Sequence, residues 1–214
     1  GIHKKNPIFD LKKKKVDILV NLSASPYTFK KLELRSKVSS FAAQYLQVPL
    51  IYVNQIGAND NLIFDGNSFI LDKNGSKIKQ LKSFSEDLSS WDIEQTKPQK
   101  NKFEKSEMSS IFDALVLGVR DYAQKCGFKT ALIGLSGGID SALVSAIATA
   151  ALGSNNIYCV SMPSKWSSSH SKSDAKDLAR RLKINFNSIP IENLMSSFEE
   201  SFIKTISFEM AEIT

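Results

Sequence analysis

The segment TALIGLSGGIDSALVSAIATAAL, residues 130–152, predicts a strand, a glycine loop and a helix in direct succession. The apolar run 131–135 is typical of a buried parallel strand. Apolar residues then recur at helical spacing over 142–150, and Gly153 is a typical helix end. The intervening SGGIDS, residues 136–141, is therefore expected at the N-terminus of a helix.

The residue types in this loop favour an anionic ligand. The paired glycines, Gly137 and Gly138, allow the backbone to come close to a ligand. Free N–H groups at the start of a helix attract negative charge, and the hydroxyls of Ser136 and Ser141 add donors. Asp140 would repel a bare phosphate, but it could hold a Mg²⁺ ion that bridges phosphates. The plainer interpretation is a turn that merely uses glycine, and the clustered acid and hydroxyls make it less convincing.

Two common phosphate loops are absent, because no lysine follows these glycines and the spacing G-x-G-x-x-G does not occur. The SGGIDS motif instead resembles the pyrophosphate loop of the ATP pyrophosphatase family, whose members cleave ATP between the α and β phosphates and adenylate a substrate. The resemblance implies ATP and Mg²⁺ as ligands, with Asp140 as the metal ligand. The implied ATP-binding residues are Gly134, Leu135, Ser136, Gly137, Gly138, Ile139, Asp140 and Ser141.

Composition indicates a globular chain. The 214 residues are 42% hydrophobic, and no apolar run reaches the ~18 residues of a membrane span. The two cysteines, Cys126 and Cys159, do not form a CxxC pair and are expected in the core. A net charge of +6 raises the possibility of nucleic acid, but the lysines are interspersed with acids, so no nucleic-acid partner is expected. A cytoplasmic protein without membrane attachment fits these features.

The first part of the chain predicts a short helix, 8–15, and then a buried strand, 16–22. A helix follows, with one apolar face. Strands are expected at 50–54, 62–64, 68–71 and 76–81, with Asn74-Gly75 as a hairpin turn between the last two. The residues of the predicted helix face are Leu34, Val38, Phe41, Ala42 and Tyr45. No Ser–His–Asp arrangement is present in this part, because its one histidine is His3.

The segments NLSASPYTFKK and YVNQIGANDNLIFDGNSFILDKNG resemble the later part of a nitrilase-type glutaminase domain, in particular the one fused to glutamine-dependent NAD synthetases. The resemblance implies an α/β/β/α sandwich. The Cys, Glu and Lys that catalyse glutamine hydrolysis in that family would precede Gly1, so none is expected in this chain. The resemblance assigns glutamine contacts to Ser25 and Lys31. From the residues alone, Ser25 would be a loop serine before proline, and Lys31 a solvated lysine in the first turn of a helix.

After a polar linker, the second part alternates helices and strands. Phe112, Leu115, Val116, Val119 and Tyr122 predict one helix face, with Gly127 as the helix end. The sequence then predicts a strand at 157–162, a loop at 163–170 and a helix capped by Ser171 and Asp174. A strand at 186–189 and a final helix should follow. The residues on one face of that helix are Met195, Phe198, Phe202 and Ile206. This order predicts a parallel sheet with the glycine loop at its carboxyl edge. The segment MPSKWSSSHS again resembles glutamine-dependent NAD synthetases, and Lys165 and His170 could contact nucleotide.

These observations predict an α/β chain: the C-terminal part of a nitrilase-like α/β/β/α sandwich, 1–92, a linker, 93–105, and the first part of a doubly wound, Rossmann-like ATP pyrophosphatase domain, 106–214. The resemblance implies a homo-oligomeric ligase that amidates deamido-NAD with ammonia from glutamine. It also implies that this sequence is the middle of a longer enzyme. Two alternatives remain open: another ATP pyrophosphatase, or a nucleotide-binding module without chemistry.

Overall fold

The computed structural model describes residues 6–94, 97 and 106–206. The chain divides into two compact units, Gly1–Tyr122 and Ala123–Thr214, and each is described by itself below. Most of the predicted linker lies outside the described residues, so the boundaries expected from the sequence stay a prediction. None of the helices within the described ranges combines the length and the apolar character of a membrane span.

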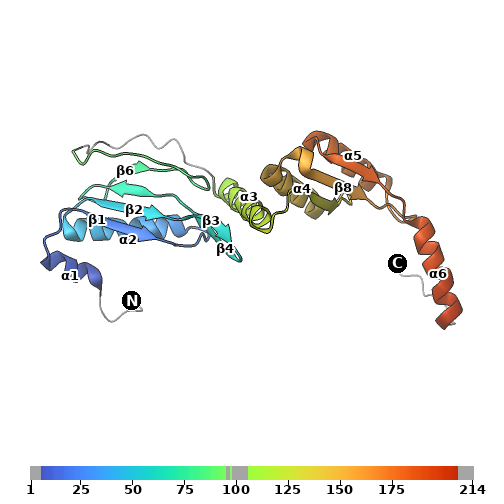
Figure 1. Ribbon diagram of the computed structural model, residues 1–214, viewed down its shortest axis with the longest axis horizontal. Coiled ribbons are helices and arrows are strands. Elements are labelled where there is room, and N and C mark those ends of the chain that lie inside the picture. Colours follow the sequence, from blue (N-terminus) through green and yellow to red (C-terminus); the bar gives the residue numbers. More distant parts are fainter. Residues whose placement is uncertain (1–5, 95–96, 98–105, 207–214) are drawn as a thin grey trace. The chain divides into compact units, whose positions relative to one another are not determined.

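The first unit is built on a mixed four-stranded sheet with the strand order β1-β2-β5-β6 (Figure 1). β1 and β2 are parallel, while β5 pairs antiparallel with both β2 and β6. A separate antiparallel pair, β3-β4, includes a strand that the sequence did not predict. The elements are α1 (Pro7–Lys13), β1 (Leu19–Ser23), α2 (Lys31–Leu46), β2 (Leu50–Asn54), β3 (Ile56–Asn59), β4 (Leu62–Asp65), β5 (Phe69–Leu71) and β6 (Lys77–Gln80). The turn between β5 and β6 includes Asn74 and Gly75, as predicted.

Helix α2 lies along one face of this sheet (Figure 1). Ala42 and Ala43 are its contact residues, because small side chains let the helix approach the strands closely. Across from them, the rings of Tyr52 and Phe69 stack at 4.9 Å between centroids. Leu50 and Leu71 complete the cluster, and both are fully buried. The burial of β2 alternates along the strand, as expected where one face packs against a helix, whereas all three residues of β5 are buried.

One prediction about burial in this unit was wrong, that of the first strand, and the apolar face of α2 is mostly exposed. Most of the apolar stripe on α2 is exposed, with Val38 61% accessible, whereas Arg35 and Ser39 are buried. The strand predicted to be buried, β1, is an edge strand of the sheet, and its Leu22 is 78% exposed. Arg35 is buried because its guanidinium group bonds the loop after β1 and Asp65 of β4.

Helix α3 (Glu107–Cys126) packs within the first unit through Ala114 and Leu117. Ala114 and Leu117 join Phe84 in a buried cluster that also includes Ile63. The helix that carries the predicted face is present, but of the residues on that face Val116 is buried while Phe112, Leu115, Val119 and Tyr122 are exposed. The predicted helix end is confirmed: Gly127 has a φ of 74°, and the amide of Phe128 bonds back to the Ala123 carbonyl at 2.8 Å.

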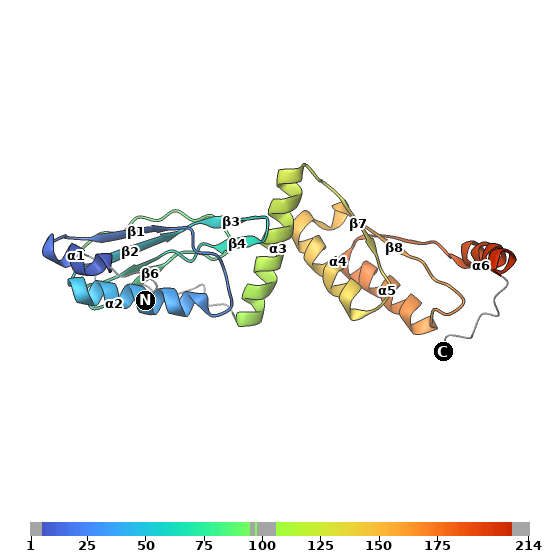
Figure 2. The same cartoon turned by 90° about the horizontal axis from the view of Figure 1, so that it is seen from below.

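The second unit is a parallel three-stranded sheet with the order β7-β8-β9 (Figure 2). The connections from β7 to β8 and from β8 to β9 each lead to the next strand on the same side and have the same handedness. Helices α4 and α5 therefore lie on the same face of the sheet, and they contact each other. The core between them and the sheet includes Ile157, Cys159 and Ala175, all with 0% exposure. The elements are β7 (Ala131–Gly134), α4 (Ile139–Leu152), a 3-10 turn (Ser154–Asn156), β8 (Ile157–Ser161), α5 (Ser169–Leu182), β9 (Asn185–Ser188) and α6 (Glu192–Ile206).

The predicted fold class is confirmed, with two local corrections. Helix α5 is capped by Ser168, whose hydroxyl accepts from the amide of Ser171 at 3.1 Å, so the predicted Ser171–Asp174 capping box was placed one turn too late. Cys159 is buried as expected, but Cys126 is exposed because it ends α3.

Candidate functional site

The glycine loop connects the end of β7 to the start of α4, as predicted. Leu135 is 1% exposed, and its amide donates to the carbonyl of Val160 at 2.9 Å. The loop therefore begins from a fixed point in the sheet. No acceptor is found within the described residues for the amides of Gly137, Ile139, Asp140 and Ser141. Such a group of unbonded N–H donors at a helix start is a site for an anion.

The two hydroxyls of the loop hold each other. The Oγ atoms of Ser136 and Ser141 are 3.2 Å apart. Ser141 donates to the carbonyl of Gly138 at 3.0 Å, and the amide of Gly138 donates to Ser136 at 3.2 Å. With its proton committed to Gly138, Ser141 is the acceptor in the pair, so Ser136 is the donor. Both hydroxyls therefore stiffen the loop in this state, and the free donors are the backbone amides.

The two glycines have different roles. Gly137 has a φ of 89°, and a Cβ at this position would overlap with the carbonyl oxygen of Ser171. The loop thus comes close to the first turn of α5, an approach that a side chain would prevent. Gly138 has an ordinary φ of −82°, and a Cβ there would meet Ser136 Oγ at 3.4 Å, an ordinary contact.

This difference predicts unequal effects of alanine. Gly137→Ala should lower the free energy of unfolding by about 1–3 kcal/mol, because it combines an unfavourable φ with a backbone overlap. Gly138→Ala, the matched control, should change stability by no more than about 0.5 kcal/mol. Denaturant unfolding of the two variants measures both values. Equal destabilisation by the two alanines would contradict the assignment of the close approach to Gly137.

Asp140 is exposed and is the second residue of α4. The N-cap of this helix is Gly138, and no hydrogen bond or ion pair is recorded for the Asp140 carboxylate in the part of the chain that the structure describes. Asp140 therefore does not cap this helix. Across 6–94, 97 and 106–206, no three His, Cys, Asp or Glu side chains come together as a metal site. A metal at Asp140 would need its other ligands from phosphate and water.

A cavity of ≈ 230 Å³ opens beside the loop, at the carboxyl ends of β7 and β8. Three of the predicted residues line it, namely Gly134, Leu135 and Ser136, and its other walls come from β8, the following loop and the start of α5. These other residues are Val160, Ser161, Met162, Pro163, Ser167, Ser171 and Lys172. The position agrees with the rule that ligands of parallel sheets bind at the carboxyl edge.

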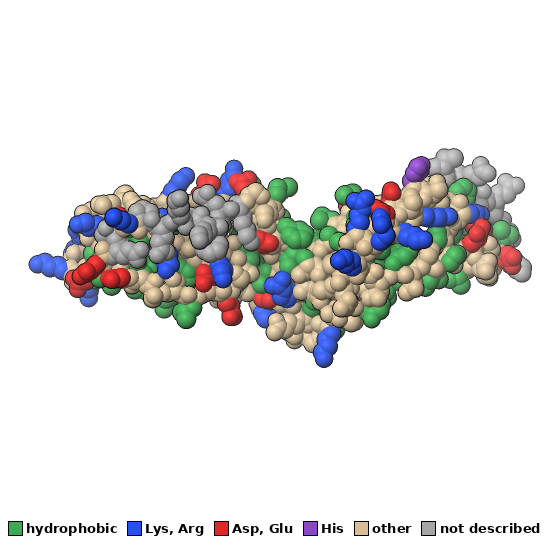
Figure 3. Space-filling model, turned by 90° about the horizontal axis from the view of Figure 1, so that it is seen from above, with side chains coloured by type: hydrophobic (Ala, Val, Ile, Leu, Met, Phe, Trp, Pro, Cys, Tyr) green, Lys and Arg blue, Asp and Glu red, His purple; other side chains and the backbone are tan. Residues whose placement is uncertain are grey.

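Lys172 is the basic residue of this cavity, and the sequence analysis did not identify it. Basic side chains gather over α5, which carries Lys172, Lys176, Arg180 and Arg181 (Figure 3). Of these, Arg180 and Arg181 are paired with Asp177, whose pKa they hold below its usual value through hydrogen bonds. Lys172 is near the start of α5, one residue after Ser171, and the start of that helix follows the carboxyl end of β8. This position in the sequence could have indicated a cavity residue.

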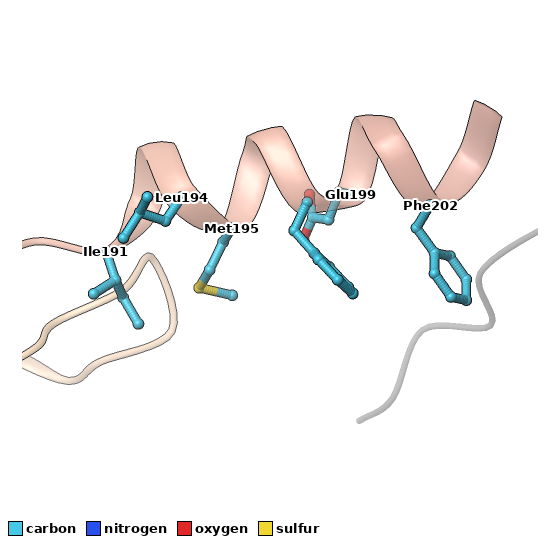
Figure 4. Close-up of a pocket in the computed structure, with 6 residues that line it drawn as sticks. Ile191, Leu194, Met195, Glu199 and Phe202 are labelled. Atoms are coloured by element: carbon cyan, nitrogen blue, oxygen red, sulfur yellow. The ribbon is translucent and has the colours of Figure 1, made fainter. Parts of the chain in front are cut away.

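The two loop residues suggested by the sequence do not line this cavity. Lys165 lies 3.8 Å from the carboxylate of Glu199 and over the ring of Trp166. His170 is exposed in the first turn of α5. A separate hollow of ≈ 490 Å³ follows the apolar face of α6, where Met195 and Phe202 lie on one side of the helix (Figure 4). Phe198 also lines it. Among the described residues that line it, Glu199 is the one with a charged or polar side chain, whereas a substrate site usually has several converging polar groups.

In the first unit, Ser25 lies in the loop after β1 and Lys31 is the first residue of α2. Ser25 is held by Asn54 and Arg35 through its backbone and its hydroxyl. Lys31 is partly exposed, and no hydrogen bond or ion pair is recorded for its ammonium group among the described residues. Nearby, burial raises the pKa of the Tyr27 phenol, and the charges of Asp65 and Glu107 raise it further.

The model of the NAD synthase family matches residues 111–213, and the model of the carbon-nitrogen hydrolase family matches residues 2–100. Over 92% of its length, the chain is 46% identical to a glutamine-dependent NAD(+) synthetase of Synechocystis sp., of which it covers 36%. It is 36% identical to the protein of the same name from Rhodobacter capsulatus and covers 37% of it. The chain thus spans little more than a third of the curated relatives that it matches.

Solved structures give the same result. The structure of glutamine-dependent NAD+ synthetase from Acinetobacter baumannii in complex with ADP superimposes with a TM-score of 0.87 at 35% identity. This match covers 96% of the present chain and 40% of that protein. A glutamine-dependent NAD(+) synthetase from Cytophaga hutchinsonii has a TM-score of 0.82 at 18% identity, which shows likeness of fold.

Proposed function

Because this chain belongs to the family of glutamine-dependent NAD(+) synthetases, we propose that it supplies parts of two active sites to an enzyme that makes NAD from deamido-NAD, ATP and glutamine. The observation that carries the proposal is the glycine loop. Ser136 lines a cavity at the carboxyl edge of a parallel sheet, and the amides of Gly137, Ile139, Asp140 and Ser141, which follow it in the chain, have no acceptor among the described residues. The similarity of the first unit to carbon-nitrogen hydrolases supports glutamine as the nitrogen source.

At the synthetase site, a carboxylate oxygen of deamido-NAD attacks the α-phosphate of ATP, and pyrophosphate leaves. Ammonia then displaces AMP from the acyl adenylate to give the amide. The amides of Gly137, Ile139, Asp140 and Ser141 would donate to the pyrophosphate as its negative charge develops. Lys172 would add a positive charge at the cavity wall. The ordered hydroxyls of Ser136 and Ser141 keep the amides fixed before the substrate arrives.

The donor set fits Mg²⁺, which commonly binds one or two carboxylates together with substrate phosphates and water. Asp140 offers an exposed carboxylate that is recorded with no bond to the described residues, beside amides suited to phosphate. Bound there, the ion would supply positive charge against the phosphates. Asp140 itself would hold this charge at the start of α4.

At the glutaminase site, Ser25 and Lys31 would contact glutamine. A lysine that begins a helix, is partly exposed and has no recorded pairing can meet the α-carboxylate of an amino acid. Ser25 is fixed by hydrogen bonds from Arg35 and to Asn54, so it can offer its hydroxyl in a constant position. The nucleophile of glutamine hydrolysis would come from outside this chain.

Lys31→Ala is expected to raise the glutamine KM about tenfold or more, the scale for a lost charge-assisted contact. Synthesis supported by added ammonia should be almost unchanged, since it does not use the glutamine pocket. Lys37→Ala, on the same helix and exposed, is the matched control and should affect neither activity. Steady-state assays with both nitrogen sources, in a full-length enzyme that contains this chain, provide the test. Equal loss of both activities would argue against a pocket role for Lys31.

The proposed enzyme is cytoplasmic and homo-oligomeric. The consumption of ATP supports a cytoplasmic location. Exposed apolar side chains on α2, among them Val38 and Phe41, support a homo-oligomer, because apolar surface of this kind marks contact sites.

A direct test of the chemistry is product stoichiometry: the full-length enzyme should form NAD, AMP and pyrophosphate in equal amounts. ADP and phosphate as products would overturn the proposed adenylation.

A further inference from the structure

Arg35 is the centre of a buried polar network beneath the Ser25 loop. Arg35 lies on α2, and its side chain is 5% exposed. Nη1 donates to both carboxylate oxygens of Asp65, at 2.7 and 3.0 Å. Nη2 donates to the carbonyls of Ser25 and Pro26, at 2.8 and 3.0 Å, and Nε donates to Ser25 Oγ at 3.0 Å. These bonds use every N–H donor that a guanidinium has, so Arg35 has none left for a ligand.

The same network holds Ser25 by all of its polar atoms. Its amide donates to Asn54 Oδ1 at 2.9 Å. Its carbonyl accepts from Arg35 and, at 3.3 Å, from Asn54 Nδ2. Asp65 is 1% exposed and is itself fixed by Asn67, whose amide group donates to it at 2.7 Å. Ser25 is therefore more tightly restrained than an ordinary loop serine.

The bond from Arg35 also settles what the Ser25 hydroxyl can do. A guanidinium only donates, so Ser25 Oγ is the acceptor in that bond. The hydroxyl keeps its proton, and no acceptor for this proton is recorded in the described part of the chain. A hydroxyl that accepts from a cation is also polarised toward donation. The remaining partner for Ser25 is an acceptor oxygen.

We infer that Arg35 and Asn54 are positioning residues, which fix Ser25 as a hydrogen-bond donor to an acceptor oxygen of glutamine, its carboxylate or its amide carbonyl. The inference rests on the proposed glutamine pocket and adds the direction of the hydrogen bond and the groups that impose it. Asp65 acts one step further away, by holding Arg35. Arg35 itself does not touch the substrate.

The test uses a full-length enzyme that contains this chain and follows glutamine KM, kcat and ammonia-dependent synthesis. Ser25→Ala, Arg35→Lys and Asn54→Ala should each raise the glutamine KM about fivefold to tenfold, with kcat at saturating glutamine within about twofold, since the lost bond is to the ground state as well. Ammonia-dependent synthesis should not change. The double variant Ser25→Ala/Arg35→Lys should have a KM no higher than the worse single variant, because both remove the same bond.

Asn67→Gly is the control, because Asn67 bonds Asp65 but not Ser25, and its φ of 54° suits glycine. It should lower the melting temperature and leave the glutamine KM unchanged. If Arg35→Lys fails to fold, Asn54→Ala still carries the test, since it leaves the Arg35–Asp65 pair intact. Two results would overturn this inference but not the glutamine pocket. One is a double variant in which the two effects on the glutamine KM add. The other is a normal KM for Arg35→Lys and Asn54→Ala together with a raised KM for Ser25→Ala. A normal KM for both Ser25→Ala and Lys31→Ala would overturn the pocket itself.

Discussion

Asp140→Asn is expected to lower Mg·ATP-dependent pyrophosphate release by about two orders of magnitude or more, the scale for a lost electrostatic contact to a transition state. Asparagine keeps the size and the helix-start preference of aspartate but lacks the charge that attracts Mg²⁺. The structure makes the substitution a clean one, because Gly138 is the N-cap of α4 and the Asp140 carboxylate is recorded with no bond to the described residues. The melting temperature should therefore hardly change.

Glu107→Gln is the matched control for Asp140→Asn. Glu107 is also an acid in the first turn of a helix, so its neutralisation removes the same favourable interaction with a helix dipole. Pyrophosphate release should remain normal in this variant when ammonia is the nitrogen source. Near-normal release by Asp140→Asn at low millimolar Mg²⁺ would refute the metal role and leave Asp140 as a charge at a helix start.

Asp65→Ala should cost about 3–5 kcal/mol of stability in the first unit, because it leaves the Arg35 guanidinium buried without its counter-charge. This is a large part of the ~5–15 kcal/mol that folded domains have. Arg35 and Asp65 are 5% and 1% exposed in their side chains, so water cannot replace the lost bonds without opening the structure. Hydrogen exchange of α2 and β4 peptides measures the loss, since amide protection reports local opening.

Asp177→Ala is the matched control for Asp65→Ala, because Asp177 also pairs with arginine but lies on the surface of α5. Its removal should leave the exchange of both peptides unchanged, as exposed ion pairs contribute little. Undiminished protection of α2 in Asp65→Ala would contradict a structural role for the buried pair, and with it the restraint on the Ser25 loop.

The strand, glycine loop and first helix of the second unit could be predicted from the sequence because their signals are local. The apolar run before Ser136, the glycines and the helical periodicity after Asp140 lie within 130–152, and the structure has β7 and α4 there. The same holds for β2 and for the turn that includes Gly75. Local signals could not show which other segment of the chain packs against each helix face or strand. The apolar stripe on α2 was found, but it is exposed, whereas Arg35 is buried.

The candidate sites show the same limit. Gly134 to Ser136, which are adjacent in sequence, line one wall of the cavity, but Lys172 comes from a different helix. The contacts of the loop residues with ATP stay a prediction. The network around Ser25 joins Arg35 to Asp65, thirty residues away, and no periodic pattern connects them. The role of Gly137 also depends on a distant neighbour, since the group that it approaches is the backbone of Ser171.

We propose that this chain belongs to an enzyme that transfers the amide nitrogen of glutamine to deamido-NAD at the expense of ATP. Glutamine labelled with ¹⁵N in its side-chain amide, given with deamido-NAD, ATP and Mg²⁺ to a full-length protein that contains this chain, tests it most directly. We expect mass spectrometry to find the label in the carboxamide of the NAD formed, and an excess of unlabelled ammonia to dilute it. If no NAD forms with either nitrogen source, the claim is contradicted.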